Sequence, residues 1–301
     1  DILSGEEGDD YLNGGYGNDS LVGGNGDDDL QVYDLSTGDQ LNGGAGMDTA
    51  WFTTTLLIDV DAGPIKKPGK TVVKKGSSNE YVLNAADDGS LQGTLSAESL
   101  NIVSIEGLGA FVGGSFDDTV DVSGLLIQDG SHLDGAYGND TLTGGLGNDV
   151  LDGGSGNDIL IGGSDNDTLN GGEGDDKLHV SDLTTDDYLD GGAGNDEASL
   201  TGVYSTLDSY NLWSVNGSLQ GTLGGVALNL TSIENLTYFN GGTGDDVVNV
   251  SGLSAQGNTR LQGREGNDIL TGGVGDDTLF GDSGNDDLNG GSGNDILIGG
   301  T

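Results

Sequence analysis

The sequence predicts an all-β fold built by stacking a short repeat, with two β-hairpin or meander insertions. The chain of 301 residues contains 61 Gly and 42 Asp but only 2 Pro. Gly costs about 1 kcal/mol per residue inside a helix and Asp is a poor helix former, so a mostly helical fold is disfavoured. A pattern rich in Gly and Asp recurs every nine residues and ends in a short apolar stretch. A unit this short predicts one loop and one strand.

Charge and composition exclude several classes of protein. The chain has 51 acidic and 8 basic residues, a net charge of −43, and no Cys. Such a chain repels nucleic acids and anionic lipids, so no nucleic-acid partner is expected. No run approaches the roughly 18 apolar residues of a membrane span, and a disulfide scaffold is impossible without Cys. High charge is also typical of disorder, so the spacing of the acids decides between disorder and a metal-dependent fold.

Sixteen near-complete nine-residue units occupy about half of the chain. They begin at Gly5, Gly14, Gly23, Gly43, Gly113, Gly135, Gly144, Gly153, Gly162, Gly171, Gly191, Gly241, Gly263, Gly272, Gly281 and Gly290. Positions one, two and four are mostly Gly, where φ can be positive or a carbonyl must approach a ligand. Position five is Asn or Asp in all units but one, and these residues tolerate the left-handed conformation.

Position six is Asp in every unit, and position eight is Leu, Val or Ala. We therefore expect a six-residue loop followed by a three-residue strand that points one apolar side chain inward. The aspartates are the candidate metal ligands: Asp10, Asp19, Asp28, Asp48, Asp118, Asp140, Asp149, Asp158, Asp167, Asp176, Asp196, Asp246, Asp268, Asp277, Asp286 and Asp295.

The repeat resembles the RTX (repeats-in-toxin) nonapeptide GGxGxDxUx, which binds calcium. The resemblance implies a right-handed parallel β-roll, an RTX solenoid, in which two units make one turn. It also implies that calcium lies between a loop and the loop two units later. The earlier loop then provides the carbonyls of positions two and four with its Asp. The later loop provides the carbonyls of positions one and three with its Asp.

On this sequence the resemblance implies a set of backbone ligands beside the aspartates. In the regular runs the carbonyls are those of Glu6, Gly8, Gly23, Asn25, Ala136, Gly138, Gly145, Gly147, Gly153, Gly154, Ser155, Gly156, Gly162, Ser164, Gly171, Glu173, Arg264, Gly266, Gly273, Gly275, Gly281, Ser283, Gly290 and Ser292. Where the runs join, they are those of Gly24, Gly26, Gly43, Ala45, Gly172, Gly174, Gly191, Ala193, Gly242, Gly244, Gly263 and Glu265. These sets predict on the order of ten calcium ions.

Calcium is also the cation that the residue types favour. Two carboxylates with four carbonyls suit a hard cation with about six ligands. The absence of Cys and the presence of only 2 His argue against zinc, copper and iron. Magnesium resists dehydration and rarely takes an all-protein cage. One apolar side chain per unit is too small a core to order the chain alone, so we expect the repeats to be disordered without calcium.

The repeats occupy residues 1–50, 113–198 and 241–301, and β-rich inserts occupy residues 51–112 and 199–240. Residues 89–125 align with 217–253 without gaps, with 23 identities in 37 positions, so the inserts are duplicates. Each predicts a hairpin: residues 81–83 with 90–95, and residues 210–215 with 218–223 across Asn216-Gly217. The first insert also holds a Lys-rich hairpin near residues 63–79. We expect either a solvated tip or a contact with an acidic neighbour there.

No catalytic residue is expected. His132 and His179 lack a nucleophile and an orienting acid in any recognisable motif, and the adjacent Asp pairs combine a turn residue with a metal ligand. The resemblance implies type I secretion and folding outside the cell. We interpret the chain as a structural region of a secreted bacterial cell-surface protein, an S-layer subunit or adhesin. The alternative is the secretion and folding module of an exported protease, lipase or pore-forming toxin.

The expected partners are calcium ions, with other copies of the chain or cell-surface polysaccharide as further candidates. The sequence starts in mid-pattern at Asp1 and stops within a repeat at Thr301. This pattern predicts a fragment of a longer protein.

Overall fold

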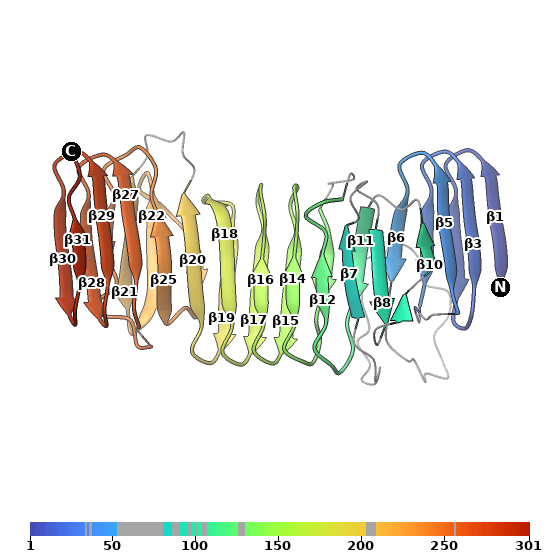
Figure 1. Cartoon of the computed structure of the whole chain (residues 1–301), viewed down its shortest axis with the longest axis horizontal. Helices are drawn as coiled ribbons and strands as arrows, with labels where there is room; N and C mark the ends of the chain where they lie inside the picture. The colour runs from blue at the N-terminus through green and yellow to red at the C-terminus, as the bar shows by residue number, and fades with distance from the viewer. Residues whose placement is uncertain are drawn as a thin grey trace. The chain divides into compact units, whose positions relative to one another are not determined.

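A computed structural model describes most of the chain, and its described residues are all-β, as predicted. They form 31 strands and no helix (Figure 1), so no helix among them could cross a membrane. The chain divides into two compact units, Asp1–Leu142 and Thr143–Thr301. The lysine-rich segment near residues 63–79 lies outside the described residues, which are 1–33, 35, 38–52, 81–85, 91–95, 98–99, 101–103, 107–125, 130–202, 209–255 and 257–301.

The first unit is built from two parallel ladders and one hairpin. Its ladders run in the orders β1-β3-β5-β10 and β2-β4-β6-β11-β13, and a further set pairs in the order β12-β7-β8-β9. The strand bounds are β1 (Ile2–Glu7), β2 (Tyr11–Gly15), β3 (Ser20–Asn25), β4 (Asp29–Val32), β5 (Gln40–Ala45), β6 (Thr49–Phe52), β7 (Tyr81–Ala85), β8 (Leu91–Leu95), β9 (Glu98–Ser99), β10 (Asn101–Val103), β11 (Gly107–Val112), β12 (Thr119–Asp121) and β13 (His132–Asp134). Strand β14 (Thr141–Thr143) spans the division between the units.

The second unit repeats this plan. Its strands pair in the orders β15-β17-β19-β24, β16-β18-β20-β25-β27-β29-β31 and β23-β22-β21-β26-β28-β30. The bounds are β15 (Val150–Ser155), β16 (Ile159–Ile161), β17 (Thr168–Glu173), β18 (Lys177–Leu183), β19 (Tyr188–Ala193), β20 (Glu197–Gly202), β21 (Tyr210–Val215), β22 (Ser218–Leu223), β23 (Val226–Ala227), β24 (Asn229–Thr231), β25 (Asn235–Asn240), β26 (Val247–Asn249), β27 (Arg260–Glu265), β28 (Ile269–Val274), β29 (Thr278–Ser283), β30 (Asp287–Ser292) and β31 (Ile296–Ile298).

The register explains the nine-residue period. Leu151 pairs with Leu169 in parallel, 18 residues or two units later, and Leu169 pairs with Leu189. Side chains alternate between the two faces of a strand, so position eight of every unit falls on the same face. Leu151, Leu160, Leu169 and Leu189 are fully buried. The core is therefore a narrow stack of single apolar side chains, which confirms a parallel β-solenoid.

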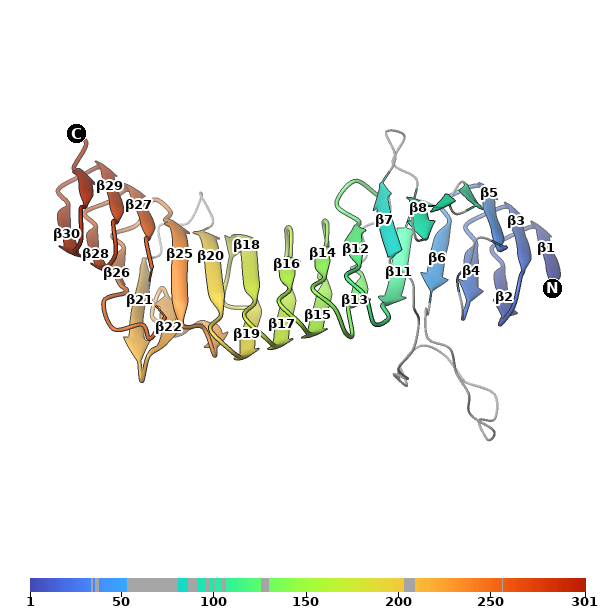
Figure 2. The same ribbon diagram turned by 60° about the horizontal axis from the view of Figure 1, so that its bottom comes forward.

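The predicted hairpins are present in both inserts. Strand β21 pairs with β22 in antiparallel fashion, and β7 pairs with β8 in the same way (Figure 2). Between β21 and β22, Asn216 has φ 56° and Gly217 has φ 91°. This is the positive-φ pair that a tight two-residue hairpin turn requires.

The second half of each insert returns to the roll. Strands β10 and β11 pair in parallel with β5 and β6, and β24 and β25 do so with β19 and β20. In both copies, one ladder ends at a returning strand, β10 or β24. The first hairpin strand, β7 or β21, pairs in parallel with β12 or β26 and so starts a new ladder. The inserts therefore take the place of coils of the solenoid.

Candidate metal centre

The position-six aspartates form ladders along the loops of the solenoid. One carboxylate oxygen, Oδ1, accepts the backbone N–H of the equivalent Asp one coil earlier. Asp158 N donates to Asp176 Oδ1 at 2.8 Å, and Asp176 N donates to Asp196 Oδ1 at 2.9 Å. The same bond is accepted by Asp28, Asp48, Asp140, Asp167, Asp268, Asp286 and Asp295. One oxygen of each carboxylate is thus used to hold the loop register.

The second oxygen, Oδ2, is buried and is often left without a hydrogen bond. Asp28, Asp167, Asp176, Asp196 and Asp268 are each at most 1% exposed. Within the described part of the chain, no hydrogen-bond donor reaches their Oδ2 atoms, nor those of Asp10, Asp19 and Asp286. Buried polar atoms are normally satisfied, and a buried charge is costly without a counter-charge. A row of such atoms indicates that a cation belongs beside them.

Glycine at position one leaves space for this cation. A Cβ at Gly171 would overlap both Asp176 Oδ2 and the carbonyl oxygen of Gly191. The carboxylate of one loop and the position-one carbonyl of the next coil therefore converge on the same point. The same pair of oxygens converges on Gly5, Gly23, Gly113, Gly144, Gly153, Gly241, Gly272 and Gly281.

The predicted carbonyls of positions two and four also face the next coil. Cβ atoms at Gly172 and Gly174 would overlap the carbonyl oxygens of Gly154 and Gly156. The corresponding carbonyl oxygens of Glu6, Gly8, Gly24, Gly26, Gly145, Gly172, Gly174, Gly244, Gly266, Gly273 and Gly275 are placed in the same way. The set predicted over residues 136–158 includes residues of both units and stays a prediction.

The position-three carbonyls already have one hydrogen bond. The carbonyl of Glu173 accepts the N–H of Gly156 at 2.8 Å, and those of Asn25, Ala45, Ala193, Ser283 and Ser292 accept in the same way. A carbonyl oxygen has two lone pairs, so one hydrogen bond leaves it able to bind a cation.

Burial and mutual repulsion raise the pKa values of these carboxyls. The pKa is raised to about 7 at Asp167, Asp176 and Asp268, and to about 6 at Asp196 and Asp246. Desolvation is the largest cause in each case, and neighbouring carboxylates add to it. Among the described residues, the ion pairs are Asp1 N with Asp19 and Lys177 with Glu197. No Lys or Arg there neutralises the buried ladder.

The donor set fits calcium. Across the described ranges, no three His, Cys, Asp or Glu side chains converge on one point. A cation in these loops would therefore be held by carboxylate pairs together with carbonyl oxygens. Hard oxygen donors in flexible numbers are what Ca²⁺ prefers.

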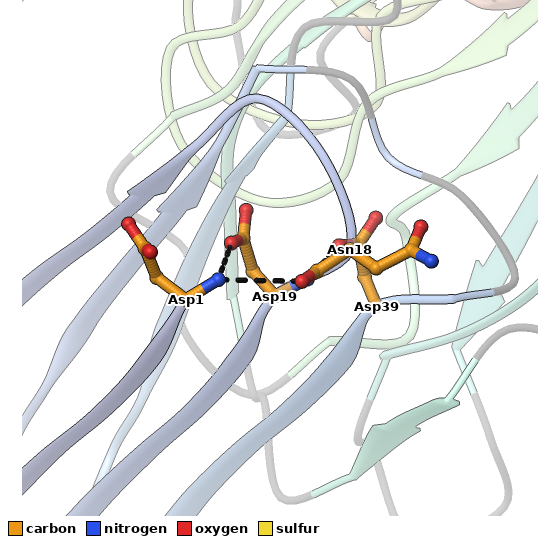
Figure 3. Close-up of polar contacts among 4 residues, drawn as sticks. All are labelled: Asp1, Asn18, Asp19 and Asp39. Carbon is orange, nitrogen blue, oxygen red and sulfur yellow. Dashed lines mark hydrogen bonds and ion pairs between the residues drawn. The ribbon is translucent and has the colours of Figure 1, made fainter.

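Three aspartates outside the sixteen units also take part in the ladder and were not predicted from the sequence. Asp1 N donates to Asp19 Oδ1 at 2.5 Å, Asp19 N donates to Asp39 Oδ1 at 2.7 Å, and Asp167 N donates to Asp187 Oδ1 at 2.9 Å. Figure 3 shows Asp1, Asp19 and Asp39 side by side. Asp39 and Asp187 each follow a ladder Asp by 20 residues and precede a Leu by two, which is the signal that could have found them.

The loop of Asp187 differs from the regular loops. Its Oδ2 accepts the Thr184 N–H at 2.6 Å and the Thr184 hydroxyl at 3.1 Å. Both oxygens of this carboxylate thus accept hydrogen bonds from the protein, one of them from Thr184 in the same loop.

The expectation for position five was wrong. Positive φ occurs at positions two and four, for example at Ala136 (φ 70°) and Asp165 (φ 73°), and no position-five residue has positive φ among those described. Instead, Asn157 Oδ1 accepts the N–H of Asp175, and Asp175 Oδ1 accepts the N–H of Asn195, both at 2.9 Å. Asn and Asp occur at this position because their side-chain oxygen forms a second ladder.

Comparison with known proteins gives a matching family and similar solved structures. The family described as RTX calcium-binding nonapeptide repeat (4 copies) matches residues 1–30, 131–160, 152–182, 183–198, 255–288 and 281–301. No curated protein matches the chain. The extracellular lipase LipA from Serratia marcescens is a similar solved structure, with 21% identity and a TM-score of 0.21; the match covers 76% of this chain and 37% of the lipase chain.

Proposed function

This chain carries the RTX calcium-binding nonapeptide repeat in multiple copies, and we propose that it is the calcium-folded structural region of a type I-secreted bacterial cell-surface protein. The observation that carries the proposal is the row of buried Asp Oδ2 atoms without hydrogen-bond donors among the described residues. Those of Asp10, Asp28, Asp176 and Asp286 face a carbonyl of the next coil across a glycine. The repeated unit is thus a cation-binding loop.

Calcium is held between successive coils in this proposal. A representative site takes the carboxylates of Asp158 and Asp176, the carbonyls of Gly154 and Gly156, and position-one and position-three carbonyls of the loop that begins at Gly171. The other predicted pairs follow the same rule. When bound, calcium supplies positive charge to a fold that is otherwise almost entirely acidic. The chain's own hydrogen-bond ladders set the register, so the cation closes loops that already face each other.

Folding is coupled to the cation in this proposal. A site between two coils does not exist in the open chain, so calcium-binding free energy is also folding free energy. The protein would remain unfolded in the calcium-poor cytosol, pass through a type I secretion channel, and fold in the calcium-rich medium outside.

Circular dichroism with and without a chelator tests this coupling. We expect a disordered spectrum in chelator and a β-rich one in millimolar calcium, reversibly. Magnesium at the same ionic strength is the control for general screening, and it should not restore the β-rich spectrum. A well-folded spectrum in chelator would falsify the proposal.

The duplicated module of repeats and insert supports a surface role, as an S-layer subunit or adhesin. Repetition of such a module, seen in the 23 identities over 37 aligned positions, is how long surface proteins extend. Light scattering in calcium tests this finer proposal, because lattice or adhesive contacts predict self-association of the folded chain. A strictly monomeric chain, joined in its full-length protein to a protease, lipase or toxin segment, would instead favour the exported-enzyme alternative.

A further inference from the structure

The second insert brings a loop outside the nine-residue repeat onto the end of an aspartate ladder. This loop, Ser232–Glu234, lies between β24 and β25. Ser232 has φ 48°, a left-handed conformation that is unusual for a residue other than Gly, Asn or Asp. An unusual backbone conformation at one point of a loop needs a compensating interaction there.

Glu234 occupies the place that a position-six Asp has in a regular coil. Asp196 N donates to Glu234 Oε2 at 3.3 Å, as Asp176 N donates to Asp196 Oδ1 at 2.9 Å. The backbone matches as well. The N–H groups of Glu234 and Asn235 donate to the Asp196 carbonyl at 3.0 and 2.9 Å. In the coil before, Glu197 N donates to the Asp176 carbonyl at 2.8 Å. The insert loop therefore continues the ladder.

Ser232 provides the carbonyl that Gly provides in a regular coil. A Cβ at Gly191 would overlap the carbonyl oxygen of Ser232 and would lie 2.7 Å from Asp196 Oδ2. One coil earlier, a Cβ at Gly171 would meet the Gly191 carbonyl and Asp176 Oδ2. The same two kinds of oxygen converge in both places.

Asp196 is aimed into this space without a partner for its second oxygen. Its side chain is fully buried, and its Oδ2 has no hydrogen-bond donor within the described residues. Neither Asp196 nor Glu234 forms an ion pair with a Lys or Arg that the structure describes. The buried Asp196 carboxylate, without a counter-charge, faces the half-buried Glu234 carboxylate, and this arrangement favours a cation beside the two groups.

We infer that Asp196, Glu234 and the carbonyl of Ser232 form a further calcium site, which the nonapeptide repeat does not encode. The inference rests on the proposed calcium-dependent fold and extends it to the insert. Carboxylates from both loops and a facing carbonyl are the hard oxygen donors that Ca²⁺ takes. The cation ties the returning strand β25 to β20, so the end of the insert is clamped onto the roll only when calcium is present.

Equilibrium dialysis with calcium alone tests the site. Glu234→Gln keeps the size of the side chain and an oxygen for the Asp196 N–H, but removes the charge. Glu197→Gln is the matched control, because it also removes one carboxylate next to Asp196 in the chain. Among the described residues, the ion pair of Glu197 is with Lys177 and not with a residue of the proposed site. We expect the parent and Glu197→Gln to bind equal numbers of calcium ions, and Glu234→Gln to bind one fewer. Equal numbers and affinities in all three would overturn the inference and leave the proposed function intact.

Hydrogen exchange in the parent chain tests the site without a substitution. The Glu234 and Asn235 amides should gain protection as calcium is added, together with the amide of Asp176. If they remain unprotected at calcium concentrations that protect Asp176, the site is absent. A parent that binds no calcium at all fails the proposed function instead, so the two failures are distinguishable.

Discussion

At the scale of single residues, the aspartate at position six has two separate roles for its two oxygens. Oδ1 of Asp176 accepts a backbone N–H and sets the register of the loop, while its buried Oδ2 lacks a donor among the described residues. The neighbouring Asp175 accepts an N–H in the other ladder. Two adjacent acids of the same type therefore differ in function because only one is directed into the site.

Asp176→Asn should weaken calcium binding by at least about tenfold, since loss of even an outer-shell partner of a metal usually costs that much. Asp175→Asn removes the same charge at a position where Asn is common, and it should leave the calcium midpoint nearly unchanged. Calcium titration followed by circular dichroism measures both. Equal midpoints would show that only net charge matters.

Ala136→Gly should stabilise the folded chain by about 1 kcal/mol. Ala136 has φ 70° at position two, and the left-handed conformation costs a residue with a Cβ roughly 1–2 kcal/mol, partly offset by the greater freedom of Gly in the unfolded chain. The opposite kind of substitution at position two of another unit, Gly172→Ala, should destabilise the folded chain, because the added Cβ would overlap the Gly154 carbonyl oxygen. Denaturant unfolding in saturating calcium compares them. A loss of stability in Ala136→Gly would contradict the conformational argument.

At the scale of elements, the strand of a regular repeat unit places one apolar side chain in a narrow core. Leu151, Leu169 and Leu189 stack in register from coil to coil. The repeat predicted this core correctly, since position eight is the only consistently apolar position. The coils that the returning strands β10 and β24 join depend on contacts distant in sequence, so the nonapeptide pattern alone does not specify their pairing.

Leu169→Ala should lower the free energy of unfolding by about 2–5 kcal/mol, the usual cost of a buried Leu→Ala change. Ile159 points outward and is 40% exposed, so Ile159→Ala should change stability by no more than about 0.5 kcal/mol. Thermal unfolding of the calcium-bound forms tests the pair. Similar losses for both would mean that the apolar stack is not the core.

At the scale of the whole molecule, the net charge of −43 makes the fold sensitive to protons as well as calcium. The pKa values of Asp167, Asp176 and Asp268 are raised from an ordinary 3.8 to about 7. Between these two pH values the folded chain therefore binds more protons than the unfolded chain. Stability then rises as the pH falls. Protons can partly replace the cation, because they remove the buried charge that the cation otherwise balances.

In chelator, the free energy of unfolding should therefore increase as the pH is lowered from about 7 towards 4, and β-structure should appear in circular dichroism. Calcium affinity should fall over the upper part of the same range, because the ligands must be deprotonated to bind the metal. Opposite pH trends with and without calcium are the expected signature. Parallel trends would show that the buried carboxyls do not control folding.

The sequence by itself determined the repeat, the all-β class, the row of aspartates at position six and the hairpin turn at Asn216-Gly217, because each depends on residues close together in the chain. Only the tertiary structure decided what the position-five residues do: they form a second ladder, in which Asp175 accepts the N–H of Asn195. It also revealed that Thr184 donates hydrogen bonds to the second oxygen of Asp187, and that Ser232 and Glu234 continue the Asp196 ladder. These depend on which loops stack one coil apart, and the chain between Asp196 and Glu234 leaves the nine-residue period before it returns.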